Sequence, residues 1–268
     1  MGLTEQNNIS IAEIVIYIPA LFIGIWLSIR HGIGRNAGWL FMIIFSLLRI
    51  IGAALQLATI SDPINVRLYI GSAVCQNVGL SPLFLVQLAL LSRALGSIRE
   101  GSTLFLSEIK LRFVELVVTV GLILSAIGGA NYDDAGNYTT SNLSVAGTAL
   151  MIAAYVLLLL STVILATQIS RVEIGQKRLV LAVGLSLPFL LVRLAYSAAT
   201  NFGNSSTFNP VNPDVNVRLG MSIIMEMIVV AIVEGIGMTL GQTPRGQVHG
   251  AVRGHRRQDI DLETNNRK

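Results

Sequence analysis

The sequence predicts an all-α, polytopic membrane protein built as a bundle of seven transmembrane helices. The first observation is composition: 53% of the 268 residues are hydrophobic and 13% are charged, whereas soluble domains carry about 25% charged residues. The second is a mean hydropathy of +0.67, and the third is a series of long apolar segments. So few charges cannot cover a water-soluble domain, and the single cysteine, Cys75, excludes a disulfide-stapled secreted module.

A helix needs about 20 mostly apolar residues to cross about 30 Å of hydrocarbon. Seven segments meet this requirement: residues 10–29, 38–60, 68–92, 111–130, 144–169, 179–200 and 218–240. We therefore predict a seven-helix domain over residues 1–240, followed by a basic, disordered cytoplasmic tail over residues 241–268.

The first three spans differ in their polar content. The span over 10–29 is not a cleaved signal peptide, because no basic segment precedes it while Arg30 follows it. The second span has Arg49 at its centre. The third, over 68–92, has no ionisable residue, and Pro82 within it is expected to free a backbone carbonyl.

Three of the last four spans carry charged residues. The fourth carries Glu115, and the fifth lies within residues 135–170, which contain no ionisable residue. The sixth has Arg193 near its middle, and the seventh carries Glu226 and Glu234. Charges at this depth are costly, so we expect them to face the interior of the bundle.

The distribution of basic residues predicts the orientation. With the N-terminus outside, 15 of the 19 Lys and Arg residues lie in the inner segments and the tail. Cytoplasmic segments carry such an excess, so we predict an N-out, C-in topology.

Glycosylation sequons point the same way. Asn137, Asn142 and Asn204 each begin an N-x-S/T sequence on the predicted outer side, and Asn8 is a fourth match that lies close to the first span. If these sequons are glycosylated, the protein lies in a secretory-pathway membrane or the plasma membrane. The alternative is chance occurrence in loops that are rich in Asn and Ser.

An internal repeat is a further hypothesis. The second and sixth spans each carry one arginine, Arg49 and Arg193, and the loops that follow them are similar over residues 62–68 and 212–219. Spans 1–3 would then be repeated as spans 5–7, with span 4 as the linker, a 3+1+3 arrangement of parallel repeats. The alternative is convergent loop composition.

Two rows of small residues predict close helix packing, because small side chains let membrane helices approach each other. They are Gly71, Cys75 and Gly79 in the third span, and Gly121, Ser125 and Gly129 in the fourth.

The polar residues at mid-membrane depth define a candidate ligand site. It consists of Arg49, Asn77, Arg193, Tyr196 and Glu226. Arginine forks suit a carboxylate, a phosphate or a polarised carbonyl, and two arginines against one acid leave a positive charge. The alternative is an ion-pair network that only holds the helices in register.

Within this site we expect Arg193 to pair with Glu226, because the sixth and seventh spans are consecutive. Arg49 would then be left to meet a ligand, with Ser46 and Gln56 as its local hydrogen-bond partners on the same helical face.

Several classes of chemistry find no support in the sequence. Lysines occur only at positions 110, 177 and 268, so no mid-span lysine can hold retinal. One cysteine cannot build a His/Cys metal cluster in the membrane, and there is no G-x-S-x-G elbow. We therefore predict no catalytic residue, no cofactor, no metal site and no nucleic-acid partner; the expected partner is the lipid bilayer.

Three stretches resemble a known family: Asn77–Leu83 continuing through Leu90–Arg93, Pro188–Arg193 with Tyr196–Ser197, and the acidic seventh span. Over about residues 5–240, the chain is similar to fungal seven-helix membrane proteins known only as a domain of unknown function, number 7702. The resemblance implies a fungal source and an integral membrane location. It implies no activity and no functional residue.

Three functions remain open at this point. The sequence best fits a seven-helix receptor or sensor that binds a small lipophilic or anionic molecule between its helices. The alternatives are a small-solute transporter that uses the repeat, and a membrane enzyme or accessory protein that acts on lipophilic metabolites with Glu226 or Glu234 as acid or base. The oligomeric state is left open.

Overall fold

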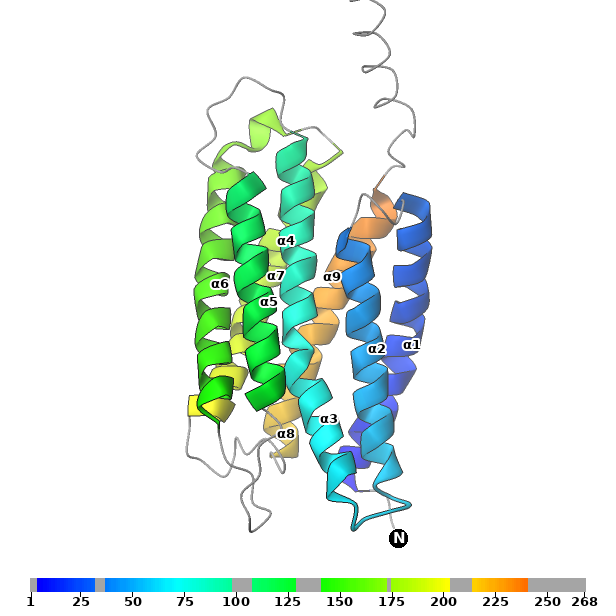
Figure 1. Ribbon diagram of the computed structural model, residues 1–268. Coiled ribbons are helices and arrows are strands. Elements are labelled where there is room, and N and C mark those ends of the chain that lie inside the picture. The colour runs from blue at the N-terminus through cyan, green and yellow to red at the C-terminus, as the bar shows by residue number, and fades with distance from the viewer. Residues whose placement is uncertain are drawn as a thin grey trace, which may run out of the picture.

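The computed structural model describes residues 4–31, 37–97, 108–128, 141–172, 175–202 and 214–240. Within these ranges every regular element is helical, and seven helices are long and apolar enough to cross a membrane. The helices run roughly side by side along one axis (Figure 1). The predicted all-helical class with seven spans is therefore confirmed, while the tail over 241–268 lies outside the described residues.

The elements follow the predicted spans closely. They are α1 (Glu5–His31), α2 (Ala37–Ala58), α3 (Val66–Val78), α4 (Leu80–Gly96), α5 (Glu108–Gly128), α6 (Asn142–Thr167), the short 3₁₀ turn η1 (Ile169–Arg171), α7 (Lys177–Phe202), α8 (Val215–Arg218), the π-helical segment η3 (Leu219–Ile223) and α9 (Ile224–Thr239). We call the end at which α1 begins the lower end, as in Figure 1, and the opposite end the upper end.

Two of the spans are interrupted. The third is made of α3 and α4, which meet at Gly79, three residues before Pro82. Proline has no N–H, so the carbonyl of Val78 has no donor four residues on. The seventh is made of α8, η3 and α9. Short π-helical segments often mark functional sites.

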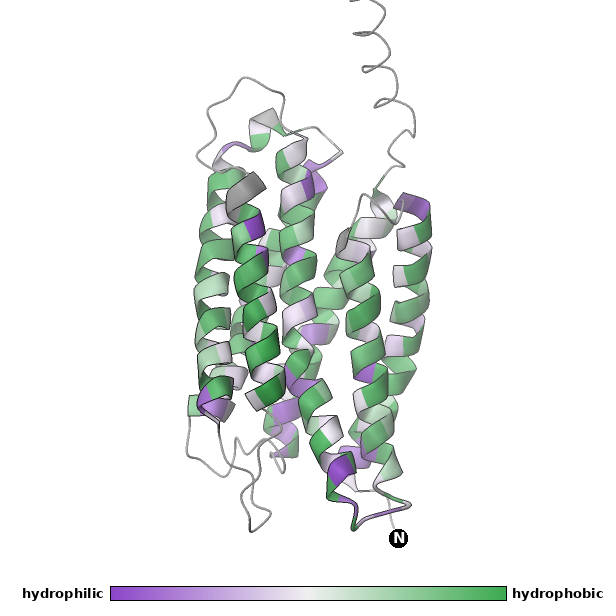
Figure 2. Cartoon of the chain, in the orientation of Figure 1, coloured by the Kyte–Doolittle hydropathy of each residue, from purple (hydrophilic) through white to green (hydrophobic). Residues whose placement is uncertain are grey.

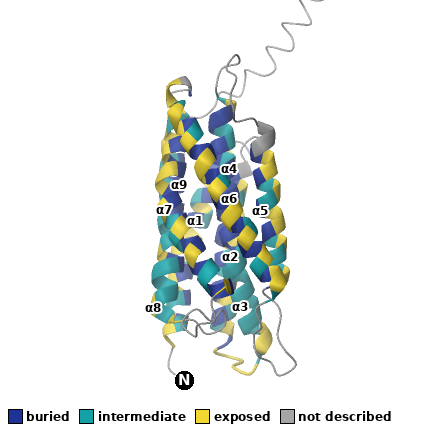
Figure 3. Ribbon diagram, turned by 90° about the vertical axis from the view of Figure 1, so that its left-hand side faces the viewer, coloured by how far each residue is buried: buried dark blue, intermediate teal, exposed yellow. Residues whose placement is uncertain are grey.

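The helix α4 forms the centre of the bundle. It packs against α2, α5, α6 and α7, and Leu83, Leu88 and Leu91 on it are completely buried. The outward faces of the surrounding helices are mainly hydrophobic, whereas hydrophilic residues gather near both ends of the bundle and at a few positions inside (Figure 2). The exposed residues run along these outward faces (Figure 3), as expected for a surface that contacts lipid.

Small residues allow close contacts in both predicted rows. A Cβ placed on Gly52 of α2 would lie 3.0 Å from Cys75 of α3. Between α5 and α6, a Cβ on Gly147 would lie 2.4 Å from Ser125 Oγ and 2.9 Å from the carbonyl of Gly121. The expected close packing is present at these positions, and Gly129 lies outside the described residues.

Candidate functional site

An ion cluster lies inside the lower half of the bundle. Glu226 of α9 accepts hydrogen bonds on one oxygen, Oε1, from Arg49 of α2 and from Arg193 of α7, the latter over 2.5 Å. All three side chains are buried. The expected pair of Arg193 and Glu226 is confirmed, but the expectation that Arg49 is left without a carboxylate is wrong.

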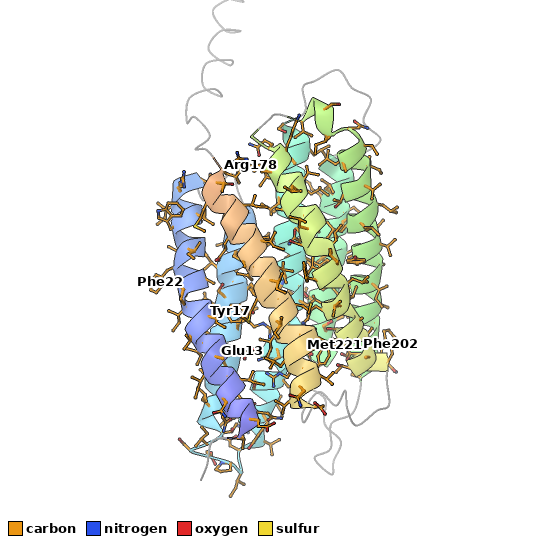
Figure 4. The ribbon with its side chains drawn as sticks, turned by 180° about the vertical axis from the view of Figure 1, so that it is seen from behind. Glu13, Tyr17, Phe22, Arg178, Phe202 and Met221 are labelled. Carbon is orange, nitrogen blue, oxygen red and sulfur yellow. The ribbon has the colours of Figure 1, made fainter. Side chains whose placement is uncertain are left out.

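The path of α9 explains this correction. This helix crosses the bundle obliquely between α1 and α7 (Figure 4), and its carboxylate reaches both arginines. Ser46 donates to the carbonyl of Met42 over 3.0 Å instead of meeting Arg49, and Gln56 lines a cavity nearby. Ser46 and Gln56, the partners expected from helical spacing, therefore do not provide the hydrogen bonds of Arg49.

Gln76 of α3 connects the cluster to a second acid. Its side-chain Oε1 accepts from Arg49, and its backbone oxygen accepts from Nη2 of both Arg49 and Arg193, over 3.3 and 3.1 Å. Its Nε2 donates to the carboxylate of Glu13, over 3.1 Å to Oε2. Glu13 is on α1 and is completely buried (Figure 4), so the network joins α1, α2, α3, α7 and α9.

Gly79 makes room for this arrangement. A Cβ at this position would lie 2.9 Å from Nη2 of Arg49, so any larger residue would displace the guanidinium. The glycine expected to serve helix packing thus serves the approach of a charged group to the helix backbone.

Two aromatic side chains pack next to the ion cluster, on the side of Arg49. The ring of Phe45 lies 5.5 Å from the guanidinium carbon of Arg49, and Tyr17 packs edge-on against Phe45 at 5.6 Å. Both rings are completely buried. These residues place an apolar layer beside the charges, which strengthens the electrostatic interactions within the cluster.

A cavity of about 30 Å³ adjoins the cluster. Its lining residues come from α2, α3, α7, α8 and η3: Gln56, Tyr69, Ser72, Ala73, Gln76, Asn77, Arg193, Tyr196, Thr200, Arg218 and Ser222. A larger cavity of about 180 Å³ at the lower end shares Gln56 and Tyr69 with it, and also borders the start of α1. Through these two shared residues the larger cavity adjoins the inner one, which Arg193 lines.

Arg218, the first residue of the predicted seventh span, is a candidate site residue that the sequence analysis does not name. The structure places it in the last turn of α8, lining the inner cavity. Its Nη2 atom is buried and has no hydrogen-bond partner among the described residues. The signal in the sequence is Asp214, which caps the helix by accepting hydrogen bonds from the backbone N–H groups of Asn216 and Val217, and so puts residue 218 nearly one turn inside the helix.

A second small cavity, of about 20 Å³, is bordered by Ser197, the hydrogen-bond partner of Arg193. Seven of its ten lining residues carry a hydroxyl or an amide group: Asn77, Ser81, Ser125, Ser144, Thr148, Ser197 and Asn201. Arg193 donates to Ser197 Oγ over 2.6 Å, and Asn201 bonds to Ser144 and to Thr148 on α6.

The predicted site residues are therefore brought together to different degrees. Arg49, Arg193 and Glu226 touch one another, and the ring of Tyr196 lies 5.6 Å from the guanidinium carbon of Arg193. Asn77 does not join the ion cluster but lines both small cavities. Within the described part of the chain, no group of three His, Cys, Asp or Glu residues could hold a metal ion.

The sequons can be placed only in part. Asn8 and Asn142 are exposed and lie near the lower ends of α1 and α6, the end to which the cavities lead. Asn137 and Asn204 lie outside the described residues. Their use as glycosylation sites stays a prediction.

Comparison with known proteins gives one match. The family model described as "Domain of unknown function (DUF7702)" matches residues 3–243. No curated protein and no solved structure matches the chain.

Proposed function

We propose that this chain, which belongs to the family of the domain of unknown function DUF7702, is a seven-helix membrane sensor for a small molecule. The ligand enters from the lower end, which faces the outside, and binds in the cavities between α2, α3, α7 and α8. The buried cluster around Glu226 forms the inner boundary of this site and responds to its occupation.

The observation that carries the proposal is the position of Arg193. This side chain lines the inner cavity and at the same time donates to Glu226 at the centre of the cluster. A ligand that draws the guanidinium toward the cavity would weaken its bond to Glu226. Such a change alters the contact between α7 and α9, which pack against each other along the bundle. A coupling of about 1–3 kcal/mol is typical for a ligand-driven switch.

Packing above the cluster favours binding over passage. Completely buried Phe45, Met42, Phe84 and Leu88 fill the interior beyond the charges. A molecule that enters from the lower end therefore meets a charged boundary backed by a dense apolar layer, which suits a site that is occupied and vacated from one side.

The orientation rests on charge. At the upper end Arg30 donates to the carbonyl of Met238 and Arg178 to that of Thr239, so these basic residues sit where the cytoplasmic surface would be. The lower end carries Asn8 and Asn142, the two sequon residues within the described part of the chain. This topology puts the cavities on the outer face of a secretory-pathway or plasma membrane, and the resemblance to fungal proteins suggests the source.

A cavity-filling variant tests the proposal. Ala73 lines the inner cavity, so Ala73→Trp should occupy it, whereas Ala54→Trp places the same ring on the exposed face of α2. Purified protein is screened against anionic and lipophilic metabolites by thermal shift. We expect every stabilising ligand to lose its effect in Ala73→Trp and keep it in Ala54→Trp. Ligands that stabilise both variants equally would refute a sensor site in this cavity.

A transporter is the second candidate, because the third and seventh spans are both interrupted, as are the substrate-binding helices of many transporters. The interruptions do not match in position: one follows α3 at Gly79, and the other begins at Leu219, near the start of its span. Arg67 and Arg218, which the proposed 3+1+3 repeat would equate, also differ, since Arg67 is exposed. Counterflow of a screened ligand in proteoliposomes would establish transport, and a sensor would show none.

A further inference from the structure

The charges around the inner cavity do not balance. Arg49 and Arg193 are matched by Glu226 and, through Gln76, by Glu13. Arg218 lines the same cavity, and no carboxylate lies within 4 Å of it among the described residues. Three arginines against two glutamates leave one positive charge beside this cavity. The Arg218 side chain is partly exposed, but its Nη2 atom is buried without a hydrogen-bond partner among the described residues, and an unpaired buried donor is costly.

The cavity wall is suited to an anion. No carboxylate belongs to its lining. Besides the two arginines, the wall carries hydroxyl groups that can donate hydrogen bonds, among them Ser72 and Ser222, which are both buried. The buried Nη2 atom of Arg218 is a further donor without a partner in the described structure. Charged donors of this kind make the strongest hydrogen bonds to anions.

The size of the cavity limits what can bind. A volume of about 30 Å³ accepts one or two groups the size of a water molecule. That is enough for a halide ion or a carboxylate group. A longer organic chain attached to such a group would extend into the adjoining cavity of about 180 Å³.

We infer that this cavity binds one monovalent anion, a chloride ion or the carboxylate of a small organic acid, between Arg218 and Arg193. The inference builds on the proposed function, because it names the chemistry of the ligand for the same site. A single negative charge neutralises the unmatched arginine, whereas a dianion would leave a new negative charge in a buried place. Binding gives the buried Nη2 atom of Arg218 an acceptor, and so the anion stabilises the folded protein.

The test uses the full-length protein in detergent, with the ionic strength held constant by sodium HEPES. Sodium chloride, acetate, butyrate and sulfate are titrated in turn, and the thermal midpoint is measured. We expect a saturable rise with chloride or with the carboxylates and none with sulfate. A response to chloride alone identifies a halide site, and a response that strengthens from acetate to butyrate identifies an organic acid.

Two arginines provide a matched pair of variants. Arg218→Gln should weaken the apparent affinity at least tenfold, while Arg67→Gln, at the exposed arginine that begins the third span, should respond like the wild type. Ala73→Leu, which fills the cavity without changing its charge, should also lose the response and serves if Arg218→Gln does not fold. An unchanged response in Arg218→Gln or Ala73→Leu, or tighter binding of sulfate, would overturn the inference.

The outcomes separate the two proposals. If neutral ligands require the cavity and no anion stabilises the protein, the proposed anion site is refuted, while the proposed sensor function is supported. If chloride binds saturably but no organic ligand depends on the cavity, the proposed anion site is supported, while the proposed sensor function is refuted.

Discussion

At the scale of single residues, the buried ion cluster is centred on Glu226. One of its oxygens accepts from two arginines, and this arrangement differs from a simple ion pair. Removing one member of a buried pair costs about 3–5 kcal/mol, because the other charge stays uncompensated. With two arginines on one carboxylate, the loss of Glu226 leaves two such charges.

This arrangement predicts a pattern of stabilities. Glu226→Leu should lower the free energy of unfolding by at least about 3–5 kcal/mol. The double variant Arg193→Leu/Glu226→Leu should not recover the wild-type value, because Arg49 then lacks its carboxylate. Unfolding of detergent-solubilised protein measures both. Full recovery in the double variant would show that Arg49 does not depend on Glu226.

Gly79 gives a second prediction at this scale. Gly79→Ala should destabilise the protein by about 1–3 kcal/mol, since the new methyl group crowds the guanidinium of Arg49. Gly184→Ala on α7 is the control, because a Cβ there meets nothing within 4 Å, and alanine improves helix propensity by up to about 1 kcal/mol. Equal effects of the two substitutions would contradict the close approach.

Part of this site was predictable from single residues. Arginine and glutamate in apolar segments have to pair, and the adjacency of two consecutive spans assigned Arg193 to Glu226. Adjacency could not show that Glu226 faces two helices at once, because that depends on the angle at which α9 crosses the bundle. Nor could it show that Gln76 carries the link to Glu13, because that contact joins α3 to α1.

At the scale of elements, the spans followed from hydropathy because the cost of exposing polar groups to lipid is high and local. The interruptions were harder to foresee. Pro82 predicts an irregular turn after α3, because it lacks a backbone N–H. The residues of the π-helical segment η3, Leu219–Ile223, contain no comparable signal. Near the irregular turn after α3, the two arginines donate to the backbone carbonyl of Gln76, a contact between distant segments that local sequence does not encode.

The contact between α5 and α6 yields a prediction for these elements. Gly147→Val should disrupt it, because even a Cβ would lie 2.8 Å from the backbone nitrogen of Ser125. Gly235→Val on α9 adds the same side chain where a Cβ meets nothing within 4 Å. We expect a clear loss of thermal midpoint in the first variant and a small change in the second. A reversed order would show that α5 and α6 do not pack through these residues.

At the scale of the whole molecule, the proposed N-out, C-in orientation rests on the charge distribution and the sequons, and it places the mouths of the cavities outside. Reporter fusions after residues 35, 102, 175 and 268 should report the cytoplasmic side. Fusions within 131–143 and 201–214 should report the outer side. A cytoplasmic signal from the segment over 201–214 would contradict the proposed topology.

The central claim is that the cavity beside Arg193 opens to the outside alone. Tyr69 lines both cavities, so Tyr69→Cys in a Cys75→Ala background places one thiol on the entry path. Arg30→Cys in the same background marks the upper end. Intact cells and inverted vesicles are treated with a membrane-impermeant methanethiosulfonate that carries a sulfonate group, and labelling is measured by mass. The account predicts labelling of Tyr69→Cys in intact cells only and of Arg30→Cys in inverted vesicles only; labelling of Tyr69→Cys from the vesicle side would contradict it.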